Sequence, residues 1–197
     1  MIRQFGHSLV SGQQAESFAT EDLFLQTARG LAEEVGLTTV SAATGALLRV
    51  LAAACGAKAV IEIGTGTGYS GLWLLRGMRP EGVLTTIDPE AEHQRIARRI
   101  FLEAGYVAGR SRVIAGRALD VLPRLSDGVY DMVLVDGEPT ERAACVAAAA
   151  RLLRPSGTLV VIGAGRGTLA EDVRADERTW TAALLPSMDG VLTAVRR

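Results

Sequence analysis

The sequence predicts an α/β fold in which a doubly wound, mostly parallel sheet ends in an antiparallel hairpin. Five short runs rich in Val, Ile and Leu alternate with stretches of helical period. Strands that are apolar on both faces are typical of parallel sheets covered by helices. Two further apolar runs near the C-terminus are joined by a loop containing Pro and Gly, which favours a hairpin at one edge.

The size and composition are those of one globular domain. The 197 residues leave little room for a second compact unit, and 48% of them are hydrophobic against 22% charged. The 21 basic and 22 acidic side chains nearly cancel, so no overall field attracts nucleic acid or an anionic membrane. The segment 1–10 lacks a charged stretch followed by an apolar run, and no apolar run of bilayer length occurs in the sequence. We expect a single domain over 1–197 in the cytoplasm, with neither nucleic acid nor a membrane as partner.

Two helices are expected first. Apolar residues at intervals of three and four predict an amphipathic helix over 18–35, which Gly36 ends. The dozen residues at the N-terminus are expected to form a mobile arm, and 1–36 together to cover the active site. Ser41 is suited to cap a second helix, which Gly56 ends.

Strands and helices then alternate. The apolar runs predict strands at 59–64, 83–88, 112–115, 129–136 and 157–162. Between them, helices are expected at 70–77, 91–104, 118–125 and 140–153. Crossover helices between successive strands imply a parallel sheet. The hairpin strands are expected at 180–185 and 191–196.

The turn after the first strand is rich in glycine. Gly64, Gly66 and Gly68 let the backbone approach a ligand and leave amides free to donate. Gly66, Gly68 and Gly71 also satisfy the dinucleotide pattern GxGxxG, which is weak on its own. A nucleotide-like cofactor is expected here, with NAD and S-adenosylmethionine (SAM) as candidates.

Two carboxylates bear on that choice. Glu62 precedes the first glycine by two residues, where it favours a ligand with an amine and would repel a pyrophosphate. Asp88 ends the second strand, from where it can bind the ribose hydroxyls of either cofactor. The C-terminal hairpin is also unusual for a dinucleotide domain. Together these features favour SAM.

From about Val40 to its end, the chain resembles the class I SAM-dependent O-methyltransferases of the catechol and caffeoyl-CoA type. Its segment EIGTGTGYS at 62–70 is similar to the EIGTxTGYS loop of that family, and further similarity lies at 85–88, 116–118, 130–136 and 152–161. The resemblance implies a Rossmann-like fold with seven strands, SAM as methyl donor, and a small hydroxylated molecule as acceptor.

The resemblance also implies the roles of individual residues. Contacts to SAM are expected from Val40, Glu62, Gly64, Thr65, Gly66, Gly68, Ser70, Asp88, Ala118 and Asp136. Within that set Asp88 faces the ribose and Ala118 the adenine. Asp136 aligns with the first metal-binding aspartate of the family and is expected near the methyl group, as the catalytic residue.

The chain departs from the family at the metal. Typical members complete the site with an Asp-Asn pair, whose positions are occupied here by Ile162 and Gly163. Because Mg²⁺ prefers a near-octahedral set of oxygen ligands, Asp136 alone is a poor site. We therefore predict that the protein has no functional metal site, and we do not expect a divalent cation as a cofactor.

The family's active-site lysine is also missing. Pro139 stands at its position, and the only lysine, Lys58, precedes the first strand at the opposite end of the sheet. A phenol titrates near ~10, so another group must assist its deprotonation. The candidate bases are Asp136, ranked first, and Glu138, Glu141 and His7. We expect His93, early in its helix, to lie on the surface.

Three functions are compatible with these features. The first is a SAM-dependent O-methyltransferase. The second is a SAM-binding protein with little or no catalysis, a sensor or assembly partner, which the missing metal ligands make credible. The third is a nicotinamide-dependent oxidoreductase, for which the chain lacks a Tyr/Lys pair with the usual spacing and a substrate domain. The acceptor is not identified, and a homodimer is left open.

Overall fold

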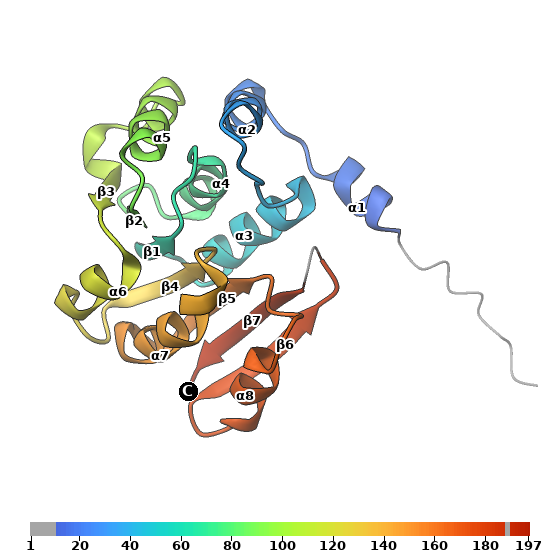
Figure 1. Ribbon diagram of the computed structural model, residues 1–197, viewed down its shortest axis with the longest axis vertical. Coiled ribbons are helices and arrows are strands. Elements are labelled where there is room, and N and C mark those ends of the chain that lie inside the picture. The colour runs from blue at the N-terminus through green and yellow to red at the C-terminus, as the bar shows by residue number, and fades with distance from the viewer. Residues whose placement is uncertain (1–10, 188–189) are drawn as a thin grey trace, which may run out of the picture.

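The computed structural model describes residues 11–187 and 190–197. Its α/β fold contains one seven-stranded sheet in the order β3-β2-β1-β4-β5-β7-β6 (Figure 1). The first five strands are parallel, and β7 runs antiparallel to both β5 and β6, which confirms the predicted hairpin at one edge. The strands are β1 Ala59–Ile63, β2 Val83–Asp88, β3 Ser111–Ala115, β4 Tyr130–Val135, β5 Leu153–Ile162, β6 Trp180–Leu185 and β7 Val191–Arg196.

Helices cover both faces of the sheet and bury two apolar clusters. One cluster joins α2, α3, α4 and α5 to the sheet through residues such as Leu48, Leu72 and Ile100. The other joins α6, α7 and α8 to the opposite face through Ala149 and Val173. The helices are α1 Gly12–Phe18, α2 Leu23–Glu34, α3 Ala42–Ala54, α4 Tyr69–Gly77, α5 Ala91–Glu103, α6 Ala118–Val121, α7 Arg142–Leu152 and α8 Leu169–Ala175.

The N-terminal helix differs from the prediction. Instead of one helix over 18–35, the chain forms α1 and α2 with a break between them. Asp22 causes the second start, because its Oδ1 accepts hydrogen bonds from the amides of Phe24 at 3.0 Å and Leu25 at 3.1 Å. Such a cap satisfies amides that have no partner within the helix. The expected arm falls largely on residues 1–10, which lie outside the described part of the chain.

Other boundaries agree with the sequence patterns. Ser41 caps α3, as predicted, with its Oγ 3.2 Å from the amide of Thr44. The strand expected at 157–162 begins earlier, at Leu153. The sequence patterns do not predict α8, because the segment 163–178 offers only a short amphipathic stretch, and Val173 is the one residue of α8 that is buried.

The topology creates a crevice at the carboxyl ends of β1 and β4. Strand β1 pairs with β2 on one side and with β4 on the other, so the chain reverses its direction of winding at β1. In open α/β sheets, ligands bind at such a switch point. The glycine turn after β1 and Asp136 after β4 both lie there. Within the described ranges, no helix combines the length and apolar character needed to cross a membrane.

Candidate active site

A cavity of about 570 Å³ opens at this crevice. Its size is within the roughly 300–1,000 Å³ typical of small-molecule sites. Eight of the predicted cofactor residues line it: Val40, Gly64, Thr65, Gly66, Ser70, Asp88, Ala118 and Asp136. Glu62 and Gly68 are not among the residues that line it. The fold therefore brings together residues that are far apart in the sequence.

The glycine turn fits closely against its neighbours. Gly64 has a φ of +95°, and a Cβ at this position would lie 2.5 Å from the carbonyl oxygen of Asp136. Gly68, which precedes α4, has a φ of +88°, and a Cβ there would lie 2.9 Å from the ring of Phe101. Both positions therefore require glycine, because L side chains rarely adopt such φ values and lack the space. Gly68 shapes the turn and does not face the cavity.

Glu62 is completely buried beneath the turn. Its Oε1 accepts a hydrogen bond of 2.6 Å from the Oγ of Ser70, which lines the cavity. Its Oε2 is buried with no hydrogen-bond partner among the described residues. Burial raises the pKa of Glu62 to about 7, while the hydrogen bond from Ser70 opposes the rise. The structure thus connects Glu62 to the cavity through Ser70.

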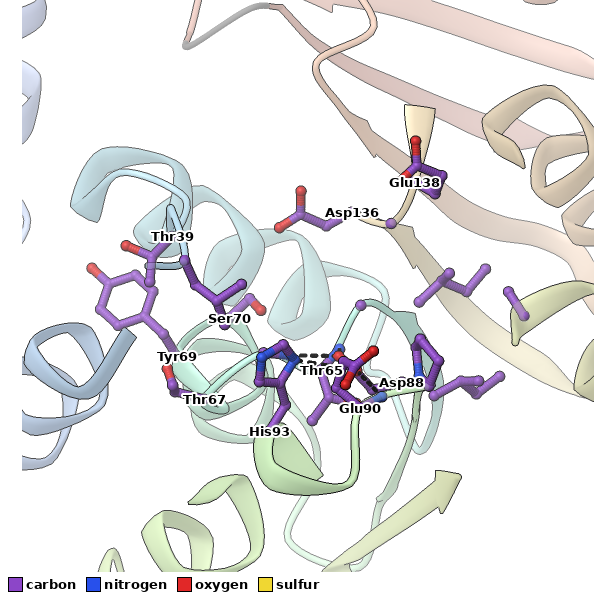
Figure 2. A pocket seen from close by; sticks show the side chains of 18 of the residues that line it. Thr39, Thr65, Thr67, Tyr69, Ser70, Asp88, Glu90, His93, Asp136 and Glu138 are labelled. Carbon is purple, nitrogen blue, oxygen red and sulfur yellow. Dashed lines mark hydrogen bonds and ion pairs between the residues drawn. The ribbon is translucent and has the colours of Figure 1, made fainter. Parts of the chain in front are cut away.

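Asp88 holds the turn in place. Its Oδ2 accepts hydrogen bonds from the amides of Thr65 and Gly66, both at 3.0 Å, and its Oδ1 accepts one from the amide of Glu90 at 2.8 Å. The carboxylate also lines the cavity, as Figure 2 shows. One side chain therefore both fixes the backbone of the turn and offers its charge to a ligand.

The position of His93 corrects the prediction of a surface residue. Its Nδ1 lies 3.3 Å from Oδ1 of Asp88, and the ring lines the cavity (Figure 2). Its side chain is 18% exposed. The first turn of α5 is folded over the end of β2, where the side-chain amide of Gln94 donates to the carbonyl of Asp88 at 2.5 Å. The sequence analysis also missed Glu90 as a lining residue. Glu90 and His93 both follow closely after Asp88, and this proximity in the sequence could have indicated that they lie at the cavity.

Asp136 stands apart from that pair, on the wall formed by the end of β4 (Figure 2). Burial raises its pKa to about 7, and the positive charge of Arg142 opposes the rise. The backbone amide of Asp136 donates to the carbonyl of Ile63 at 2.9 Å, which ties it to the end of β1. A carboxylate with a pKa near neutrality is suited to accept a proton at neutral pH.

The other candidate bases are placed differently. Glu138 and Glu141 line the cavity, but Glu141 forms an ion pair with Arg117. Lys58 pairs with Glu81 at 3.1 Å and precedes β1, at the end of the sheet away from the cavity. His7 lies outside the described residues. Asp136 is therefore the partly buried carboxylate with a raised pKa on the cavity wall.

The residues at the aligned metal position do not fit a divalent cation. Ile162 is apolar and buried, and Gly163 offers no side chain. A Cβ on Gly163 would lie 2.8 Å from Nη1 of Arg142, so a cationic group already lies beside it. Within residues 11–187 and 190–197, no three His, Cys, Asp or Glu residues are grouped as metal ligands would be. A single carboxylate next to a guanidinium is a poor donor set for Mg²⁺.

Comparisons with known proteins agree with the fold. The sequence model of a family described as "Methyltransferase domain" matches residues 61–161. A protein named "Putative O-methyltransferase" from Mycobacterium sp. (strain JLS) is 48% identical, with 92% of this chain and 90% of the relative covered. These matches span most of the chain and include the glycine turn and Asp136.

Two solved structures extend the comparison. The O-methyltransferase TomG from Streptomyces achromogenes, involved in tomaymycin synthesis and in complex with SAM, is 30% identical with a TM-score of 0.82, covering 100% of this chain and 99% of TomG. An O-methyltransferase from Bacillus cereus in complex with S-adenosylhomocysteine (SAH) is 25% identical with a TM-score of 0.80, covering 95% and 97%. The predicted fold, cofactor and enzyme class are confirmed. The chain therefore belongs to the SAM-dependent O-methyltransferases.

Proposed function

We propose that this O-methyltransferase acts on a hydroxyl of a small molecule without a divalent metal, and that Asp136 is its general base. The observation that carries the proposal is the position of Asp136, partly buried on the cavity wall at the end of β4 with its pKa raised to about 7. The unsuitable surroundings of Ile162 and Gly163 support the metal-free part.

We assign the two ends of SAM to two groups of lining residues. The part of the wall that suits the amino-acid end is formed by Val40, Gly64, Thr65, Gly66 and Ser70, with Glu62 acting through Ser70. Asp88 and Ala118 suit the ribose and the adenine. Because the oxygens of Asp88 already accept three backbone amides, neighbouring Glu90 is placed to share the ribose hydroxyls.

The reaction requires an oxygen of the acceptor to attack the methyl carbon in line with the bond to sulfur. Asp136 accepts the hydroxyl proton as the new C–O bond forms, and the C–S bond breaks to leave SAH. No net charge is lost, because the positive sulfonium becomes neutral while the carboxylate is protonated. Holding donor and acceptor together in a cavity supplies much of the rate enhancement. Asp136 contributes by removing the proton at the right place.

The N-terminal segment contributes to the cover of this cavity in our proposal. Ala32 of α2 and the following Leu37 line it. Helix α2 is held over the glycine turn because Thr67 donates a hydrogen bond of 2.7 Å to the carbonyl of Ala28. The hydroxyl of Tyr69 donates to Glu21 just before the helix, also at 2.7 Å. The segment 21–37 would thereby help exclude water during transfer.

Two measurements test the proposal. Calorimetric titration of SAM into the protein in excess EDTA should give saturable binding, and a panel of phenols and catechols should then show SAH formation without added metal. SAM binding with no turnover on any acceptor would favour the non-catalytic alternative. Binding that needs Mg²⁺ would contradict the metal-free part.

The homodimer remains a prediction. Phe18 and Leu23 flank the break between α1 and α2 and are 88% and 70% exposed, which is unusual for apolar side chains so close together. A second subunit would cover them. Light scattering after gel filtration at micromolar concentration should show a mass twice that of the chain, and a monomeric mass would contradict the prediction.

A further inference from the structure

Glu62 is a carboxyl group enclosed within the sheet. Its strand β1 lies between β2 and β4, and the residue is 0% exposed. Its Oε1 accepts the hydrogen bond of 2.6 Å from Ser70, while its Oε2 is buried with no partner among the described residues. A Cβ on Gly71 would lie 3.1 Å from Oε2, so this oxygen faces the first turn of α4. The protein thus leaves half of a buried carboxyl group without a donor.

The elements packed around Glu62 do not neutralise a charge on it. Burial raises its pKa to about 7, the hydroxyl of Thr86 acts against the rise, and the carboxylates of Asp136 on β4 and Asp88 on β2 add to it. Helix α5 brings the ring of Phe101 against the first turn of α4. Neither acidic nor basic residues occur in that first turn. Among the residues that the structure describes, no Lys, Arg or His forms an ion pair with Glu62.

The neutral form of Glu62 is therefore favoured in the free protein. Removing a carboxylate from water without a cationic partner disfavours its charged form. The N-terminus of α4 favours that form, but the effect of a helix terminus is smaller than the desolvation of a fully buried carboxyl group. The helix terminus makes the carboxylate attainable without making it the resting state. A positive charge brought close to Glu62 would change the balance.

Ser70 connects Glu62 to the cavity. Its hydroxyl donates to Glu62, and the residue lines the cavity (Figure 2). A hydroxyl has one donor and two acceptor positions, so the same oxygen can accept a hydrogen bond from a ligand. The amino-acid end of SAM carries an ammonium group, which donates, and a carboxylate, which Glu62 and Asp136 would repel. The geometry favours the ammonium group beside Ser70.

We propose that Glu62 holds a proton in the free protein and releases it when the ammonium group of the cofactor binds at Ser70, so that cofactor binding is coupled to the loss of one proton. The inference rests on the proposed function, which places the amino-acid end of SAM at Ser70. The carboxyl O–H bond breaks, its proton passes to solvent, and the ammonium group keeps its own protons. Glu62 is a positioning residue, because it acts on the cofactor through Ser70.

This coupling fixes the sign of a pH dependence. A ligand that favours the deprotonated form of Glu62 binds more tightly as pH rises toward the pKa of the free protein, about 7, and gains little above it. The reverse orientation, with the ligand's carboxylate at Ser70, would favour the protonated form. Binding would then take up a proton and weaken as pH rises. The direction of proton exchange therefore reports which group lies beside Ser70.

The test is calorimetric titration of SAH into the full-length protein at about pH 6, in buffers that differ in ionisation enthalpy. The dependence of the observed heat on the buffer gives the number of protons exchanged per ligand. SAH lacks the sulfonium charge, which would also act on Asp136. The control ligand is 5′-methylthioadenosine, which keeps the adenosine and the thioether but lacks the amino-acid end. Glu62→Gln is compared with Glu138→Gln, the same substitution at an exposed carboxylate that lines the cavity.

The native protein should release about 0.5 to 1 proton per SAH and bind SAH about five- to tenfold more tightly at about pH 7 than at about pH 5.5. Glu138→Gln should behave in the same way. Glu62→Gln should release less than about 0.2 proton, and its affinity should change by less than about twofold over the same range. With 5′-methylthioadenosine, the native protein should also release less than about 0.2 proton.

Proton uptake by the native protein, no exchange at all, or an equal release from Glu62→Gln would each overturn the inference. Thermal melts report whether Glu62→Gln folds. If it does not fold, the other titratable side chains at the cavity are removed instead, as His93→Gln and Asp136→Asn. Release of a proton by both of these variants would support Glu62, and its loss in either would overturn the inference. Native protein that binds no SAH at any of these pH values would instead contradict the cofactor assignment in the proposed function.

Discussion

Gly64 and Asp136 are in such close contact that a single methyl group cannot be placed between them. A Cβ on Gly64 would lie 2.5 Å from the carbonyl oxygen of Asp136. The contact joins the cofactor turn after β1 to the residue proposed as base after β4. The geometry of the cofactor site and that of the acceptor site are therefore coupled through the backbone.

Gly64→Ala should damage cofactor binding. The φ of +95° is unfavourable for alanine, and the methyl group meets backbone that cannot move away cheaply. We expect a loss of about 2–3 kcal/mol in stability and at least about a tenfold weaker affinity for SAM. Calorimetry and denaturant unfolding measure both. Gly30→Ala is the control, since no atom lies within 4 Å of its Cβ position. Unchanged SAM affinity in Gly64→Ala would contradict the close contact between Gly64 and the backbone of Asp136.

Asp136→Asn should remove the general base while leaving SAM bound. Loss of a general base costs about 10²–10⁴ in rate. In the native protein the rate should rise as pH passes through about 7, because the carboxylate is the active form above its raised pKa. Initial rates against pH, with SAM saturating, give the profile. A variant that keeps native turnover, or a profile without a rise around that pH, would refute the assignment, and Glu138→Gln provides the comparison.

Glu62 should make the protein less stable as pH rises toward neutrality. Folding raises the pKa of Glu62 from 4.5 to about 7, so the folded state binds more protons than the unfolded chain between those values. Its stabilising effect is complete below about 4.5 and is lost as pH rises through 7. Glu62→Gln should flatten the fall in unfolding free energy between about pH 5 and 7.5 by about 2 kcal/mol. Urea unfolding at both pH values tests this, and parallel pH dependences would argue against a buried, protonated Glu62.

Asp88→Asn should loosen the glycine turn. An amide oxygen can replace one acceptor, but it lacks the charge that strengthens the bonds from Thr65 and Gly66. We expect SAM affinity to fall about tenfold or more. His93→Ala should cost less, because the ring touches only one oxygen of Asp88. Calorimetry measures the SAM affinity of both variants. Equal losses of affinity would show that the charge of Asp88 contributes no more to SAM binding than the ring of His93.

Chelation should leave catalysis intact. Because Ile162 and Gly163 offer no side-chain ligands and Arg142 lies beside them, dialysis against EDTA should change turnover by less than about twofold. Added Mg²⁺ should not raise it. If dialysis abolished turnover and Mg²⁺ alone restored it, the cation would have to be held by residues other than those at positions 136, 162 and 163.

Much of the fold follows from local patterns in the sequence. Val60 and Ile61 belong to a run that is apolar on both faces, and the structure buries both completely in β1. Ser41 caps α3 as its residue type predicts. Glycines after β1 mark the cofactor turn. These features depend on the spacing of apolar side chains, on helix capping and on the φ values that glycine allows. Each of these is set by a few residues that are neighbours in the sequence.

Tertiary structure decided the rest. The start of α2 at Asp22, the contact of His93 with Asp88 and the placement of Arg142 beside Gly163 have no distinctive local pattern. Arg142 and Gly163 are separated by an entire helix and strand, and only the packing of α7 against β5 brings the guanidinium to that strand's end. Sequence alone therefore determined where the glycine turn and the carboxylates Glu62 and Asp88 lie along the chain, whereas the identity of the charge near Asp136 depended on long-range packing.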